Sequence, residues 1–240
     1  MTNQTADASI QKAAKVAGLA YVLIIVLAIL KVNFLEPNLI VSENDAATAN
    51  NIMANELLFR IGVVSEIIMF LLVVILSLAL YIILKTVSKI LALAALFFRF
   101  GEAIIGVVVT VLSGLIPLLL LNSEAVFETE QLQALVGLFL KVRTAGLDIV
   151  LIFVGLGGSV FCYLFFSSKY VPGILAAWGI FTYLSMLILS LVSILFPNHP
   201  VMIETVLYTL GGFFELIFGL WLLFKGVNVQ QDDVRASGSV

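Results

Sequence analysis

Long apolar runs separated by short polar connections dominate the hydrophobic pattern of this chain. Six runs exceed the roughly 20 residues that a helix needs to cross the hydrocarbon core of a bilayer. They cover residues 13–35, 57–84, 90–121, 135–166, 174–196 and 201–224. The third and fourth runs are long enough to tilt or to project past the membrane, and Pro117 predicts a kink near the end of the third. The pattern therefore predicts an all-α bundle of six transmembrane helices.

The two ends of the chain are more polar than the rest. Lys12 and Lys15 precede the first apolar run, as basic residues do in a signal peptide. The run is too long for the apolar region of such a peptide, and no small-residue cleavage site follows it. We therefore expect an uncleaved first helix, a transmembrane domain over residues 13–226, and polar tails at 1–12 and 227–240.

Composition supports a membrane location. Of the 240 residues, 62% are hydrophobic and 11% are charged, whereas a soluble domain is about half apolar and a quarter charged. A single cysteine, Cys162, excludes an intrachain disulfide, and a single histidine, His199, excludes bis-histidine haem ligation. These counts predict no metal site and no cofactor, and the absence of a basic run predicts no nucleic-acid partner.

The charges of the connections alternate along the chain. Connections 36–56 and 122–133 carry acidic residues and no Lys or Arg, and 197–200 carries no base. The intervening connections and the C-terminal tail carry Lys85, Lys89, Lys169 and Lys225. Because basic residues accumulate in short cytoplasmic loops, this pattern predicts that both termini lie in the cytoplasm.

The first acidic connection has two interpretations. Asp45 could cap a short helix that starts with Ala46 and continues toward the second span, lying over the outer mouth of the bundle. A plain solvated loop has equal support from the sequence.

Several segments carry a family resemblance. The most specific are residues 45–52, Asp-Ala-Ala-Thr-Ala-Asn-Asn-Ile, and residues 58–62, Leu-Phe-Arg-Ile-Gly; shorter ones lie at 17–21, 80–81, 98–103, 170–172 and 221–226. Over roughly residues 13–226 the chain resembles a family of small bacterial membrane proteins called domain of unknown function 4386. The resemblance implies a multi-pass protein of the bacterial inner (plasma) membrane and brings no activity with it.

Ionisable residues inside the apolar runs are the strongest functional signal. A charge at the centre of a transmembrane helix costs about 2.5–3.5 kcal/mol and usually faces the bundle interior. We expect a buried cluster in which Arg99 and Glu102, three residues apart, share a helix face, as do Lys141 and Asp148, seven apart. The candidate ligand or ion cluster comprises Glu66, Arg99, Glu102, Lys141, Arg143, Asp148 and Glu215.

The charges of this candidate cluster do not balance. Three cations face four carboxylates, so one carboxylate is left over. It could be protonated because of desolvation, paired with Arg60 near the outer edge, or matched by a bound cation. The first two interpretations are structural, and the third gives the cluster a ligand.

Three functions remain open. The first is a binder or transporter of a small solute, ion or proton, and the second is a structural or stress-related membrane component without a ligand site. The third is a membrane-embedded enzyme acting on lipid, in which Asp148 with Arg143 or Lys141 would form an acid–base pair; no catalytic residue can be assigned. The segments Glu102-Ala-Ile-Ile-Gly106 and Glu215-Leu-Ile-Phe-Gly219 also share a Glu-x-Ile-x-Gly spacing. This similarity would fit an inverted repeat of two three-helix halves.

Overall fold

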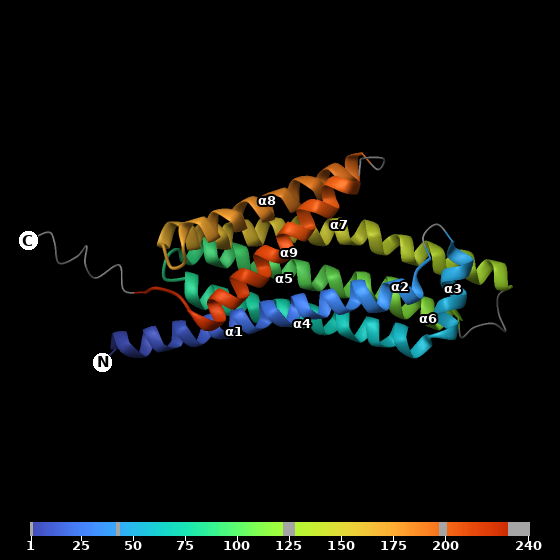
Figure 1. Cartoon of the computed structure of the whole chain (residues 1–240), viewed down its shortest axis with the longest axis horizontal. Coiled ribbons are helices and arrows are strands. Elements are labelled where there is room, and N and C mark those ends of the chain that lie inside the picture. The colour runs from blue at the N-terminus through green and yellow to red at the C-terminus, as the bar shows by residue number, and fades with distance from the viewer. Residues whose placement is uncertain (1, 42–43, 122–127, 197–200, 230–240) are drawn as a thin grey trace, which may run out of the picture.

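Helices make up all the regular secondary structure in the part of the chain that the structure describes. The computed structural model describes residues 2–41, 44–121, 128–196 and 201–229 (Figure 1). Its elements are α1 (Thr2–Leu30), η1 (Lys31–Leu35), α2 (Glu36–Leu39), α3 (Asp45–Ala54), α4 (Glu56–Leu84), α5 (Lys89–Thr110), η2 (Val111–Leu115), α6 (Ile116–Leu121), α7 (Thr129–Ser168), α8 (Gly173–Leu195) and α9 (Val201–Phe224).

Six helical segments are long and apolar enough to cross a membrane, which confirms the predicted architecture. They are Asp7–Leu39, Glu56–Leu84, Lys89–Leu121, Thr129–Ser168, Gly173–Leu195 and Met202–Phe224. Each keeps half or less of its most apolar window inside the protein, and large apolar side chains such as Ile90 and Ile174 are more than 80% exposed. So much outward-facing apolar surface suits contact with lipid and not with water.

Two helices extend further than the apolar runs predict. Residues 2–12, expected to form a polar tail, continue α1, and α7 begins at Thr129 before its apolar run. The 40 residues of α7 make a helix about 60 Å long, twice the roughly 30 Å of a hydrocarbon core. This helix is therefore long enough to tilt or to project past the bilayer.

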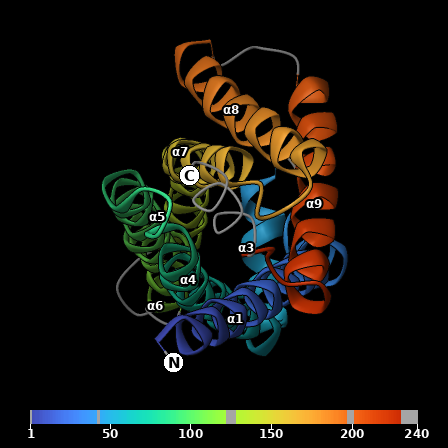
Figure 2. The same cartoon turned by 90° about the vertical axis from the view of Figure 1, so that its left-hand side faces the viewer.

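The six spans form a closed ring in chain order (Figure 2). Each span packs against the next, and α9 returns to pack against α1. The start of α1 and the end of α9 lie at the same end of the bundle, here called the terminal end (Figure 1). The short helix α3 lies at the opposite end, here called the α3 end, where it packs mainly on α7.

The helix α3 confirms one interpretation of the first connection and corrects its detail. Asn44, and not Asp45, is the N-cap, because its side chain accepts a hydrogen bond of 2.9 Å from the backbone N–H of Ala47. Asp45 occupies the first turn instead, where its charge opposes the positive end of the helix dipole. The side chain of Asp45 is thereby free to reach α7.

Two π-helical turns, η1 and η2, interrupt the first and third spans near the α3 end. Pro117 follows η2, and it lacks the backbone N–H that would donate to the carbonyl four residues earlier. The break that Pro117 predicts is therefore this widened turn. Single π turns inside α-helices are rare and frequent at functional sites, so the pair of them directs attention to this end of the bundle.

Candidate functional site

The seven predicted residues do not form one cluster. The structure places Glu66 and Arg143 in one site toward the α3 end, and Arg99, Glu102 and Glu215 in a second site deeper in the bundle. Lys141 and Asp148 belong to neither.

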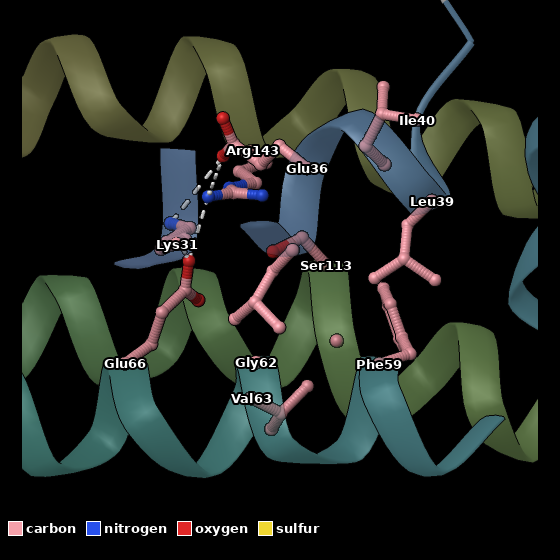
Figure 3. A pocket seen from close by; sticks show the side chains of 12 residues that line it. Lys31, Glu36, Leu39, Ile40, Phe59, Gly62, Val63, Glu66, Ser113 and Arg143 are labelled. Atoms are coloured by element: carbon pink, nitrogen blue, oxygen red, sulfur yellow. Dashed lines mark hydrogen bonds and ion pairs between the residues drawn. The ribbon is translucent and has the colours of Figure 1, made fainter. Parts of the chain in front are cut away.

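The first site, here called the charged pocket, is built around Glu66 of α4 (Figure 3). Glu66 Oε1 accepts hydrogen bonds from Lys31 Nζ of η1 and, at 2.8 Å, from Arg143 Nη2 of α7. Glu66 Oε2 accepts from Thr110 Oγ1 at 3.1 Å. Arg143 Nη2 also lies 3.1 Å from Glu36 Oε1 at the start of α2. Two cations and two carboxylates therefore form one neutral network.

A cavity of about 40 Å³ adjoins this network. One water molecule occupies about 10–15 Å³ of cavity volume measured in this way, so the cavity has room for roughly three waters or one small ion. The two π turns line it, η1 with Lys31 and Leu35 and η2 with Ser113 and Gly114. In Figure 3 the charged groups lie at one end of the cavity and apolar side chains, among them Phe59, at the other.

An open groove of about 480 Å³ lies on the other side of the Glu36–Arg143 pair. Glu36 and Arg143 line both the groove and the cavity, and the remaining groove residues come from α2 and its end and from α7. The side chains of Lys31, Glu66 and Arg143 keep 15–20% of their surface exposed, and that of Glu36 keeps 36%. The Glu36–Arg143 pair therefore stands between the cavity and the open groove.

The second site, here called the central cluster, comprises Tyr21, Arg99, Glu102, Tyr183 and Glu215. Arg99 Nη1 lies 2.8 Å from Glu102 Oε2, which confirms the predicted pairing along one face of α5. Tyr183 of α8 donates a hydrogen bond of 2.9 Å to Glu215 Oε1 of α9. The hydroxyl of Tyr21 on α1 lies 3.1 Å from that of Tyr183, so Tyr21 donates to Tyr183, whose single proton is already committed.

The central cluster lies near the middle of the bilayer. Arg99 is ten residues from the start of α5 and Glu215 nine from the end of α9, so both lie about 15 Å from the terminal end. Glu66, by contrast, precedes the end of α4 by 18 residues, or about 27 Å. The charged pocket is thus displaced toward the α3 end of a core about 30 Å thick.

The remaining predicted residues have partners elsewhere. Lys141 pairs with Asp45 of α3 at 2.8 Å, and both side chains are well exposed. Asp148 accepts a hydrogen bond of 2.9 Å from Ser193 of α8. Arg60 pairs with Glu56 on the exposed side of α4. Arg60 thus pairs with an exposed carboxylate, and the ion pairs of Lys141 and Arg143 in the described residues join them to Asp45, Glu36 and Glu66.

Sequence reasoning missed four members of these sites. Lys31 lies inside the first apolar run, where the same test for intramembrane charge would have found it, and Glu36 was assigned to the solvated connection. Tyr21 and Tyr183 carry no charge and resemble any other aromatic core residue. Their hydroxyl–hydroxyl contact joins residues 162 positions apart in sequence, so no local sequence pattern could predict it.

Metal ligation has little support in the described residues. They contain no group of three or more His, Cys, Asp or Glu side chains suited to hold a metal ion. His199 lies outside the described residues, and Cys162 is buried in α7.

The fold and its buried charges define a multi-pass helical membrane protein. The model of the family described as "Domain of unknown function (DUF4386)" matches residues 16–226, so the chain belongs to that family. Comparison with curated proteins and with solved structures gave no match.

Proposed function

We propose that this protein binds and transports a small polar solute or ion, and that the charged pocket is its binding site. The observation that carries the proposal is a cavity beside four ionised groups, inside the membrane yet partly exposed. Intramembrane ionisable residues characteristically mark substrate and ion pathways. Two π turns at the cavity wall add support, since such turns are enriched at functional sites.

The chemistry of the pocket suits a small ligand with either or both signs of charge. Lys31 and Arg143 could bind an anion or carboxylate, and Glu36 and Glu66 a cation or ammonium group. In the present arrangement these groups satisfy one another, so a ligand must exchange with an existing ion pair. The Glu36–Arg143 pair is the one to open first, because it borders the groove.

We also infer that the protein lies in a bacterial inner membrane with both termini in the cytoplasm. The end of α4, the start of α5 and the ends of α7 and α9 lie at the terminal end (Figure 1), and the lysines at or next to these helix ends are Lys85, Lys89, Lys169 and Lys225. Basic residues at helix ends favour the cytoplasmic side. The charged pocket would then open toward the extracytoplasmic side.

The proposal is tested with purified protein in lipid nanodiscs by measuring thermal unfolding in the presence of four probes: sodium chloride, sodium phosphate, ammonium chloride and glycine. We expect at least one probe to raise the unfolding temperature of the wild type, since a ligand that binds only the folded state stabilises it. Glu66→Gln and Arg143→Gln should abolish that rise.

Arg60→Gln is the matched control, because Arg60 forms a similar ion pair with Glu56 on the exposed side of α4. It should leave the probe effect intact. If no probe stabilises the wild type, or if the pocket variants respond as the control does, the binding function is wrong.

A structural role is the second candidate, and the mutual neutrality of the charged pocket favours it. A closed network of two cations and two carboxylates can fix how η1 and α2 pack against α4 and α7 without any ligand. In that case Glu66→Gln would lower the unfolding temperature of the protein, and no probe would distinguish the variant from the wild type. The same measurement therefore separates the two functions.

A further inference from the structure

The central cluster contains more acid than base. Arg99 is its one cation, whereas Glu102 and Glu215 are both carboxylic acids. Arg99 interacts electrostatically with both acids, and the two acids interact with each other. If both were ionised, a net negative charge would remain near the middle of the membrane, where an uncompensated charge is strongly unfavourable.

Within the described part of the chain, the neighbouring groups do not supply the missing positive charge. The other titratable groups that act on Glu215 are Tyr183 of α8, Tyr21 of α1 and Cys162 of α7. Each of these is neutral or anionic, and none can carry a positive charge. The second cation must therefore come from solution.

Packing leaves little space for a metal ion or a hydrated cation. Arg99 and Glu102 are each only 4% exposed, Tyr21 is 3% exposed and Tyr183 is fully buried. A Cβ atom added at Gly157 of α7 would lie 2.8 Å from Arg99 Cγ, and one added at Gly158 would lie 2.5 Å from the Tyr183 ring. On this side, which faces α7, the cluster is therefore too tightly packed for an ion with its water shell. A proton needs no such space.

From this charge count and packing we propose that the central cluster binds one exchangeable proton, carried by Glu215. Glu102 is the carboxylate in direct contact with Arg99, so it remains ionised. Glu215 contacts the neutral hydroxyl of Tyr183 through Oε1, which leaves Oε2 to bear the proton. The protonation forms one O–H bond from a proton of the solvent and involves no redox change.

Exchange of the proton requires that Glu215 be reachable from outside the bundle. Glu215 is the partly exposed member of the cluster, and its neighbour Leu216 lines a groove of about 600 Å³ between α1 and α9. Polar groups of Asn33, Thr205 and Thr209 line the same groove. On the inner side, hydroxyls continue from Glu215 through Tyr183 to Tyr21.

Infrared difference spectroscopy of the protein in nanodiscs detects the proton directly. A protonated carboxyl group gives a C=O band at neutral pH, and this band shifts when H₂O is replaced by D₂O because the proton exchanges. We expect one such band in the wild type. It should disappear in Glu215→Gln or in Glu102→Gln, because either change leaves one carboxylate opposite Arg99. Glu56→Gln, which alters an exposed carboxylate outside the cluster, should retain the band.

The proposal is overturned if the wild type shows no such band, or if the band survives Glu215→Gln or, where that variant does not fold, Glu102→Gln. Loss of the band in Glu215→Gln, with retention in Glu56→Gln, supports it. A variant that fails to fold is recognised by its amide bands in the same spectrum, and the other variant then decides. This experiment needs no solute, so its result is independent of whether the charged pocket binds a ligand.

Discussion

At the scale of single residues, the buried charges are arranged as pairs whose members depend on each other. Breaking a buried pair by removing one partner leaves an uncompensated charge, whereas replacing both partners with apolar groups is often neutral or stabilising. Arg99 and Glu102 are the clearest case, because both are 4% exposed and their nearest charged atoms lie 2.8 Å apart.

Arg99→Leu should therefore lower the free energy of unfolding by about 3–5 kcal/mol, the usual cost of orphaning a buried charge. Arg99→Leu combined with Glu102→Leu should recover most of that loss, since only the protonated Glu215 then remains in the central cluster. Unfolding followed by the fluorescence of Trp178 and Trp221 measures both variants. A double variant no more stable than Arg99→Leu alone would contradict the pairing argument.

The sequence contained most of the residues of the two sites but not their grouping. Charge inside apolar runs identified Glu66, Arg99, Glu102, Arg143 and Glu215, because the free-energy cost of such charge is a local property. Which cation meets which carboxylate depends on how distant helices pack. The sequence count left one carboxylate over without saying which, and the grouping of Glu102 and Glu215 around Arg99 required the three-dimensional structure.

At the scale of elements, small residues determine where the ring of helices closes. Gly18 of α1 lies against the backbone of α9: an added Cβ would lie 2.6 Å from Gly219 O and would also meet Leu223 N. Small residues at such crossings let membrane helices approach closely. The neighbouring α1–α9 contact holds Tyr21 in the central cluster.

Gly18→Ala should therefore destabilise the protein by about 1–3 kcal/mol, as overpacking does in a well-packed interior, because backbone atoms cannot move aside as a flexible side chain would. Gly212→Ala is the control, since an added Cβ there meets nothing within 4 Å. Thermal unfolding in nanodiscs compares them. Equal stability of the two variants would mean that α1 and α9 do not cross at Gly18.

Element boundaries were predictable only where hydrophobicity decides them. The six spans follow from apolar length alone, but the helical start of α1 and the early start of α7 involve polar residues, which have no preference for the membrane. The two π turns arise from packing and, at η2, from the following proline. Neither turn has an apolar signature, so the wall of the charged pocket could not be predicted.

At the scale of the whole molecule, the ring separates two polar environments. The charged pocket lies toward the α3 end and borders an open groove, whereas the central cluster lies near mid-membrane and is tightly packed by glycines of α7. A transported solute would bind in the first environment and a proton in the second. The binding of a solute requires that water reach the charged pocket.

Access of water to the charged pocket is tested by replacing single serines with cysteine after Cys162→Ala removes the native thiol. Ser113 and Ser77 are a matched pair: both are buried, and each bonds a carbonyl of its own helix four residues earlier. Only Ser113 lines the pocket. The account predicts that a water-soluble methanethiosulfonate labels Ser113→Cys at least tenfold faster than Ser77→Cys. Equal rates at the two positions would contradict it.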